Sequence, residues 1–197
     1  MPKKRINLIG GAPCSGKSAY SKLAMSMTPS LSLYSTGDAL KGLKDAELQK
    51  DIANGELVSD NIVISLVTER MNSIKEEEEL LFDSLPRTTA QFHWLRKWVA
   101  KNNFEPHFFL IEADEKLLWR LLDVRIEKSI NAGKEPRAED NLQSFSNRLI
   151  DYKQKTIPAW IEAERHYQDC FHRIKANKGL KDPAQKEYFT RVWKSSY

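Results

Sequence analysis

The chain has few cysteines, no long apolar run and no large excess of either charge. Its two cysteines, Cys14 and Cys170, are too few for a disulfide framework or a four-thiolate zinc site, so we expect both thiols to be unpaired. The basic start, residues 1–5, leads into an apolar run far too short for a signal peptide or a membrane span. These absences favour a cytoplasmic protein that does not interact with membranes.

The charge balance also argues against some partners. Lysine and arginine total 31 against 27 acidic residues, which gives a net charge of +4. A dedicated nucleic-acid binder usually carries a denser basic patch, so we expect no nucleic-acid partner. The four histidines are scattered without the spacing of metal ligands, and we expect them in packing or at the surface. The chain has no internal repeat, and its 197 residues fit one domain.

Short apolar runs alternate with longer segments of helical period. This order predicts an α/β fold in three layers, with a five-stranded parallel sheet flanked by helices. The expected strands are Arg5–Ile9, Leu31–Tyr34, Glu79–Asp83, His107–Glu112 and Phe171–Lys175. The helical pattern is clearest over residues 58–74 and 91–99.

The sharpest motif is G-A-P-C-S-G-K-S, residues 11–18, between the first expected strand and a helical stretch. In the pattern G-x-x-x-x-G-K-S the glycines let the backbone curl, so that successive N–H groups point at an anion. The following helix adds the positive end of its dipole, and Lys17 reaches the outer phosphates. This context favours a phosphate-binding loop over an ordinary glycine turn.

Several arginines suit chemistry on two phosphate groups. Phosphoryl transfer needs donor and acceptor phosphates in line, with their charge neutralised in a site that excludes bulk water. A guanidinium bridges two phosphate oxygens and stays charged at any working pH. The candidates are Arg87, Arg120, Arg125, Arg137 and Arg148. Arg87 is the strongest of them, because it follows Pro86 at the end of an apolar strand.

Four further segments make this interpretation more specific. They are YSTGDALK (34–41), NGELVSDNIVISLVTERM (54–71), LLFDSLPRTTAQ (80–91) and PRAEDNLQSFSNRLIDYKQKTIP (136–158). In order and spacing, they and the phosphate loop resemble the motifs of adenylate kinases and related nucleoside monophosphate kinases, over residues 6–174. The resemblance implies the P-loop NTPase fold and transfer of a phosphoryl group from ATP, with Mg²⁺, to a nucleoside monophosphate.

The resemblance also implies how the donor is held. ATP would be bound by the loop and by Arg120 and Arg125. The loop residues are Gly11, Ala12, Pro13, Cys14, Ser15, Gly16, Lys17, Ser18 and Ala19. Asp83, at the carboxyl end of its strand, would hold Mg²⁺ through water, with the Ser18 hydroxyl as a further candidate ligand. The cysteines that carry zinc in members with a larger lid are missing here, so no zinc is expected.

On the acceptor side, Arg87 would bind the phosphate of the monophosphate and Gln91 would hydrogen-bond its base. The full set of expected acceptor residues is Thr36, Lys41, Gly55, Glu56, Leu57, Val58, Ser84, Arg87, Gln91, Arg137 and Arg148. Arg137, expected at the start of a helix, and Arg148, three turns along that helix, would close on the transferring group.

Some residues depart from the family pattern. Lys41 stands where an arginine is usual. An ammonium binds the acceptor phosphate as a point charge and not in the bidentate way of a guanidinium, which predicts weaker acceptor binding. Ser84 replaces the usual glycine close to the acceptor base. Arg120 and Arg125 are one residue further apart than in the family, and Ser18-Ala19 replaces Gly-Thr.

We expect AMP as the acceptor, because Thr36 and Gln91 favour adenine. Ser84 opposes this choice and keeps UMP, CMP or a deoxynucleoside monophosphate as the alternative. A non-catalytic nucleotide-binding regulator on the same fold is a further alternative. We expect a monomer with a core (1–34, 76–125 and 139–197), an acceptor flap (35–75) and a short flexible lid (126–138).

Overall fold

The computed structural model describes residues 3–197 and is built on one parallel five-stranded sheet. The strand order is β2-β3-β1-β4-β5. The strands are β1 (Lys4–Gly11), β2 (Leu31–Ser35), β3 (Glu79–Asp83), β4 (Phe104–Glu112) and β5 (Phe171–Lys175). This confirms the predicted α/β fold and its five strands. β4 begins earlier than expected, because Phe104 already pairs with Lys4 of β1.

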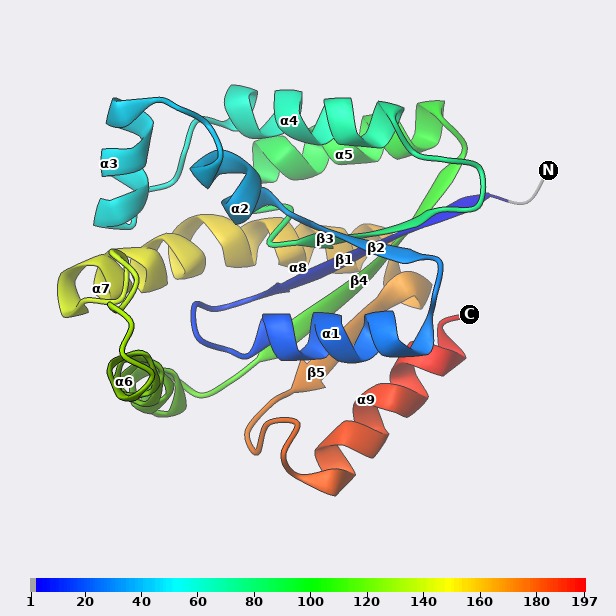
Figure 1. The fold of residues 1–197 in the computed structure, drawn as a ribbon. Coiled ribbons are helices and arrows are strands. Elements are labelled where there is room, and N and C mark those ends of the chain that lie inside the picture. Colours follow the sequence, from blue (N-terminus) through cyan, green and yellow to red (C-terminus); the bar gives the residue numbers. More distant parts are fainter. Residues whose placement is uncertain (1–2) are drawn as a thin grey trace.

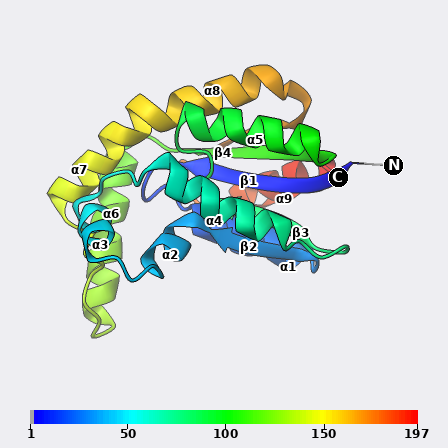
Figure 2. The same ribbon diagram turned by 90° about the horizontal axis from the view of Figure 1, so that it is seen from above.

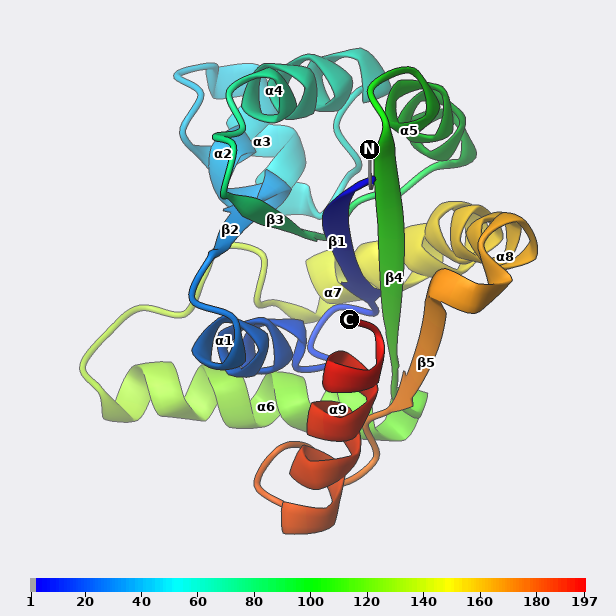
Figure 3. The same cartoon turned by 90° about the vertical axis from the view of Figure 1, so that its right-hand side faces the viewer.

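Helices cover both faces of the sheet. They are α1 (Lys17–Met27), α2 (Thr36–Lys41), α3 (Ala46–Asn54), α4 (Asp60–Asn72), α5 (Thr89–Lys101), α6 (Glu115–Asn131), α7 (Leu142–Asp151), α8 (Ile157–His166) and α9 (Pro183–Ser195). Figures 1 and 3 show α4 and α5 on one side of the sheet and α1 and α9 on the other. Figure 2 shows α8 lying beside α5.

The core follows from the two-residue period of the strands. Successive side chains of a strand point to opposite faces, and a sheet covered on both faces is apolar throughout. Leu8 and Phe82 pack in the cluster beneath α4, α5 and α8. Ile9 and Leu81 pack in the cluster beneath α1 and α9. All four side chains are buried, so the sheet is held from both sides.

The carboxyl ends of the central strands meet at one edge of the sheet. Asp83, the last residue of β3, pairs with Ile9 of β1 and with Ser35 of β2. The loop after β1, the start of α2 and the segment after β3 therefore lie together. Helices α6 and α7 stand at this same end of the molecule (Figure 1).

One long helical rod passes this edge. Helix α7 continues through a π-helical turn, η1 (Tyr152–Thr156), into α8 without a break (Figure 2). The side chain of Asn141 caps α7, since its Oδ1 accepts from the Ser144 N–H at 2.9 Å. Residue 137 therefore precedes the helix, and the expectation that Arg137 begins it is wrong. Arg137 lies exposed in the preceding loop.

The segment expected as a flexible lid is partly regular structure. Helix α6 continues to Asn131, so residues 126–131 are helical, and a non-helical stretch follows up to Asn141. Gly133 ends this helix with a φ of 65°. That the flap and the lid move as units stays a prediction.

Two further expectations concern cysteine and membranes. Cys14 and Cys170 are both free, as predicted. Among the helices of residues 3–197, none combines the length and the apolar character that crossing a membrane requires.

Candidate active site

The phosphate loop curls through three residues with positive φ, namely Gly11 (148°), Cys14 (62°) and Gly16 (88°). A Cβ atom at Gly11 would lie 2.5 Å from the carbonyl oxygen of Ile111, so only glycine fits there. Gly16 also stands at the N-cap of α1, where it has no side chain to satisfy the first-turn N–H groups. The Ala19 N–H donates to the Gly16 carbonyl at 2.8 Å, which leaves the amides of Lys17 and Ser18 available to an anion at the positive end of the helix.

Lys17 lies inside this loop. Its Nζ donates to the carbonyl oxygens of Gly11 and Ala12, both at 2.9 Å. Burial is the main reason that the pKa of Lys17 is lowered to about 8; the nearby Asp83 carboxylate opposes this shift, and the positive charges of Arg87 and Arg148 add to it. The ammonium group is thus held among other cations, where phosphate oxygens would stabilise it.

A pocket opens between the phosphate loop, the segment after α3, the segment after β3 and the α7–α8 rod. The expected site residues that line it are Gly11, Pro13, Lys17, Gly55, Leu57, Ser84, Arg87 and Arg148. Residues expected on the donor side and on the acceptor side therefore share one cavity. Its other lining residues are Gly10, Pro86, Asp151, Tyr152, Thr156 and Trp160, which sequence reasoning missed.

The arginines of the pocket are enclosed. Arg87 donates from Nε to the Ser84 carbonyl at 3.3 Å, and its pKa is lowered by burial and then by the charge of Arg148. The pKa of Arg148 is likewise lowered, by burial and then by Arg125. Within residues 3–197, Arg148 Nη1 and Arg125 Nε are buried donors without a hydrogen-bond partner. An anionic ligand would supply acceptors to such groups.

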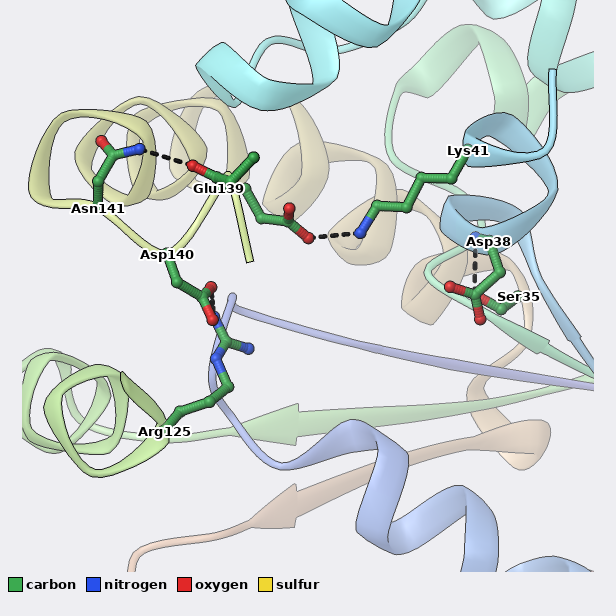
Figure 4. Close-up of polar contacts among 8 residues, drawn as sticks. Ser35, Asp38, Lys41, Arg125, Glu139, Asp140 and Asn141 are labelled. Carbon is green, nitrogen blue, oxygen red and sulfur yellow. Dashed lines mark hydrogen bonds and ion pairs between the residues drawn. The ribbon is translucent and has the colours of Figure 1, made fainter. Parts of the chain in front are cut away.

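Two adjacent carboxylates pair with cations of the expected site (Figure 4). Lys41 Nζ lies 2.5 Å from Glu139 Oε1, and Arg125 Nη2 bonds to Asp140 Oδ1. The carboxylate side chains are 11% and 1% exposed, so both pairs are largely shielded on their acidic side. Sequence reasoning missed both acids. The available signal was an acidic pair that begins two positions after an arginine in the segment P-R-A-E-D-N.

Gln91 is occupied within the protein. Its Oε1 accepts from the Arg87 N–H and its Nε2 donates to Asp60 Oδ1, both at 2.8 Å. Because Gln91 is buried, these bonds fix the backbone of Arg87 at the pocket wall. The expected contact of Gln91 with a base therefore needs an exchange of partners.

The end of β3 is tied to its neighbours. Thr36 Oγ1 donates to the Asp83 carbonyl at 3.1 Å, and Ser84 Oγ donates to Asp83 Oδ1 at 2.9 Å. Ser84 has a φ of 67°, in the region that favours glycine. The serine hydroxyl thus holds the carboxylate that was expected to bind Mg²⁺.

Some expected residues lie away from the pocket lining. Five positions along a helix turn a side chain by about 500°, so Arg120 and Arg125 project about 140° apart on α6. Arg120 and Arg137 are both exposed. The other expected residues outside the lining are Ala12, Cys14, Ser15, Gly16, Ser18, Ala19, Thr36, Lys41, Glu56, Val58, Asp83, Gln91 and Arg125. Among these, Val58 packs against the core.

A comparison with family models decides the lineage. The model described as "Adenylate kinase" matches residues 9–166, from the end of β1 to the end of α8. The chain belongs to the adenylate kinase family. All the expected site residues lie inside this match, whereas β5 and α9 lie outside it.

Curated adenylate kinases from several bacteria are similar along most of the chain. That of Phocaeicola vulgatus is 33% identical over 171 residues, which cover 82% of this chain and 86% of the relative. That of Bartonella bacilliformis is 30% identical over 161 residues, covering 78% and 83%. That of Rhizobium meliloti is 29% identical over 181 residues, covering 87% and 90%. The adenylate kinase relationship therefore extends over nearly the whole length of these relatives.

Proposed function

We propose that this chain transfers a phosphoryl group from ATP to AMP and forms two molecules of ADP. One observation carries the proposal: Lys17, Arg87 and Arg148 line a single pocket, although they come from three separate segments. Lys17 belongs to the donor side and Arg87 to the acceptor side. Membership of the adenylate kinase family supports the same reaction.

The residues have distinct tasks in this reaction. The loop amides and Lys17 bind the β- and γ-phosphates of ATP, and Arg87 binds the phosphate of AMP. An oxygen of AMP forms a bond to the γ-phosphorus while the bond from that phosphorus to the β–γ bridging oxygen breaks. Arg148 neutralises the charge that develops between the two nucleotides. No proton donor is required, because the bridging oxygen departs as part of the ADP phosphate.

Mg²⁺ fits the residues at the end of β3. The Asp83 carboxylate is an oxygen ligand of the kind this ion prefers, and it lies close enough to the phosphate loop for its charge to oppose the lowering of the pKa of Lys17. Asp83 would hold the ion through water, with Ser18 as a second candidate at the start of α1. When bound, Mg²⁺ neutralises phosphate charge. The Ser84 hydroxyl orients the carboxylate.

The acceptor flap contacts α7. Gly55 has a φ of 81°, and a Cβ atom there would lie 2.5 Å from the Ser144 carbonyl oxygen. Asn147 Nδ2 also donates to the Asn54 carbonyl at 3.1 Å. These contacts, with the Lys41–Glu139 pair, would exclude water while the phosphoryl group moves. We further infer a monomer that acts in the cytoplasm, as expected from the sequence.

A panel of nucleoside monophosphates tests the function. With ATP and Mg²⁺, we expect AMP to give the highest kcat/KM in a coupled assay of ADP release. Ser84 in the pocket lining is the observation that favours another acceptor, so UMP, CMP and deoxynucleotides belong in the panel. Strong turnover of CMP without turnover of AMP would refute AMP as the acceptor. ATP binding without transfer to any monophosphate would instead indicate a regulator.

Gly55→Ala is expected to lower kcat/KM for AMP by about tenfold. An L-residue in the left-handed region costs about 1–2 kcal/mol, and the methyl group would also meet the Ser144 carbonyl. The flap would then close less often. Steady-state kinetics with AMP as the varied substrate measures the effect.

Gly179→Ala is the matched control for this substitution. Gly179 also has a positive φ, of 66°, but nothing lies within 4 Å of its added Cβ. The control therefore carries the backbone strain without the contact to α7. Equal kinetics in both variants would show that the approach of Gly55 to α7 has no role in the reaction.

A further inference from the structure

A second cluster of reactive side chains lies at the amino-terminal edge of the sheet. Glu105 and His107 lie near the start of β4, and Cys170 lies just before β5. One donor atom from each of the three residues lies within 4.8 Å of the others. The phosphate loop leaves the opposite, carboxyl-terminal edge, so this cluster is separate from the kinase pocket.

The strand register brings these residues together. Glu105 and His107 are two positions apart in β4 and therefore point to the same face. Cys170 precedes Phe171, which pairs with Phe108, so Cys170 stands beside His107. His107 Nε2 and Glu105 Oε2 are 3.5 Å apart. Glu105 and His107 lie on the paired strand β4, and Cys170 directly precedes β5, so the fold holds the three side chains close without any ligand.

We propose that Glu105, His107 and Cys170 form a binding site for a zinc ion. A thiolate, an imidazole and a carboxylate are the ligands that zinc takes in proteins, with a fourth position open to water. Zinc bonds of about 2.0–2.3 Å place donors about 3–4 Å apart. The pair of Glu105 and His107 already has this spacing, and rotation of the half-buried Cys170 side chain closes the rest.

The donors are free for this task. His107 is 8% exposed, and its Nε2, which faces the Glu105 carboxylate, is the nitrogen placed to bind zinc. Cys170 forms no disulfide. Its thiol proton passes to solvent as the sulfur–zinc bond forms.

The charges around the cluster permit a divalent cation. The carboxylate and a thiolate together balance the charge of zinc. Arg5 is the nearest cation on β1, and its guanidinium bonds to Asn7 and Ser196 and lies 3.8 Å from the ring centre of Tyr197. Lys3 Nζ lies 3.8 Å from Glu105 Oε1, and the Lys3 side chain is 58% exposed. Because an exposed ion pair contributes little free energy, Lys3 moves away from Glu105 at little cost in stability. Zinc would join the start of β4 to the turn that enters β5.

Zinc titration of the full chain against a chromophoric chelator tests the site. We expect one zinc ion per chain and a higher melting temperature when it is bound. With Co²⁺ in place of zinc, a thiolate-to-cobalt charge-transfer band should appear. Cys170→Ser should remove that band and lower zinc affinity by at least about 100-fold, the upper end of the cost of an outer-shell partner.

His93→Ala is the matched control. His93 Nε2 lies 2.7 Å from the Glu162 carboxylate. This pair has the imidazole and the carboxylate of the proposed zinc site but, among the residues that the structure describes, no cysteine beside them. This variant should bind zinc as the original chain does. The absence of a one-to-one complex, or a thiolate band that persists in Cys170→Ser, overturns the proposal. Cys170 is half-exposed, so its replacement by serine should leave the fold intact, which circular dichroism checks. None of these readouts depends on the kinase reaction.

Discussion

Arg148→Met is expected to lower kcat about 10³-fold while leaving the protein as stable as before or more stable. An arginine that neutralises a transferring phosphoryl group is worth about 10³–10⁵ in kcat. In the free protein, however, Nη1 of Arg148 is buried without a partner, and Arg125 adds like charge. Removing a buried donor of this kind is expected to raise the free energy of unfolding by about 1 kcal/mol.

The two halves of this prediction are measured separately, by steady-state kinetics and by thermal unfolding without nucleotide. Arg165→Met is the control, because Arg165 lies exposed on α8, away from the pocket. It should change neither quantity. A loss of activity in Arg148→Met that is matched by a loss of stability would contradict the assignment, since it would show a structural role for the guanidinium.

The affinity for ATP is expected to fall about tenfold for each pH unit above pH 8. The pKa of Lys17 in the free protein is about 8, below its ordinary value of 10.5. The group is therefore charged below pH 8 and loses its proton as the pH rises above it. Phosphate oxygens favour the protonated, charged form of Lys17. Above pH 8, ATP binding must therefore be accompanied by uptake of a proton by Lys17. Titration calorimetry at several pH values between 7 and 9.5, in buffers of different ionisation enthalpy, measures both the affinity and the proton uptake.

Lys17→Arg is the control for this pH dependence. A guanidinium keeps its charge throughout this range. The variant should bind ATP more weakly, because its planar fork differs from an ammonium, but its affinity should change little with pH. If the original chain and the variant showed the same slope, the titrating group would be another one.

The strands and the phosphate loop were predictable because each depends on local sequence. The apolar run over residues 79–83 has the bounds of β3, and that over 171–175 has the bounds of β5. The positive φ of Gly16 follows from a loop that must turn straight into α1. In these places the local pattern of residues is enough to predict the element, whereas the early start of β4 depends on its pairing with β1.

The rest of the site depends on contacts between distant segments. Lys41 and Glu139 are 98 positions apart, and no period or motif spacing indicates that they pair. The predicted start of α7 at Arg137 was wrong because the Asn141 side chain caps the helix, which therefore begins at Leu142. The spacing of Arg120 and Arg125 did indicate a departure from the family, and on the helix they project in different directions. Which carboxylate faces which cation is decided by packing of the whole chain.

The π-helical turn determines which side chains of the α7–α8 rod share a wall of the cavity. Apart from Asp151, the residues of the rod that line the cavity recur at every fourth position: Arg148, Tyr152, Thr156 and Trp160. In an unbroken α-helix, four residues overshoot a full turn by about 40°, so the last of these side chains would have drifted about 120° around the axis. In the wider π-helical turn η1, each residue rotates its side chain around the axis by less than in an α-helix. The turn therefore cancels part of this rotation of about 120°. A single irregularity thus lets one continuous rod present a cation at one end and, at the other, an indole anchored to the Pro86 carbonyl.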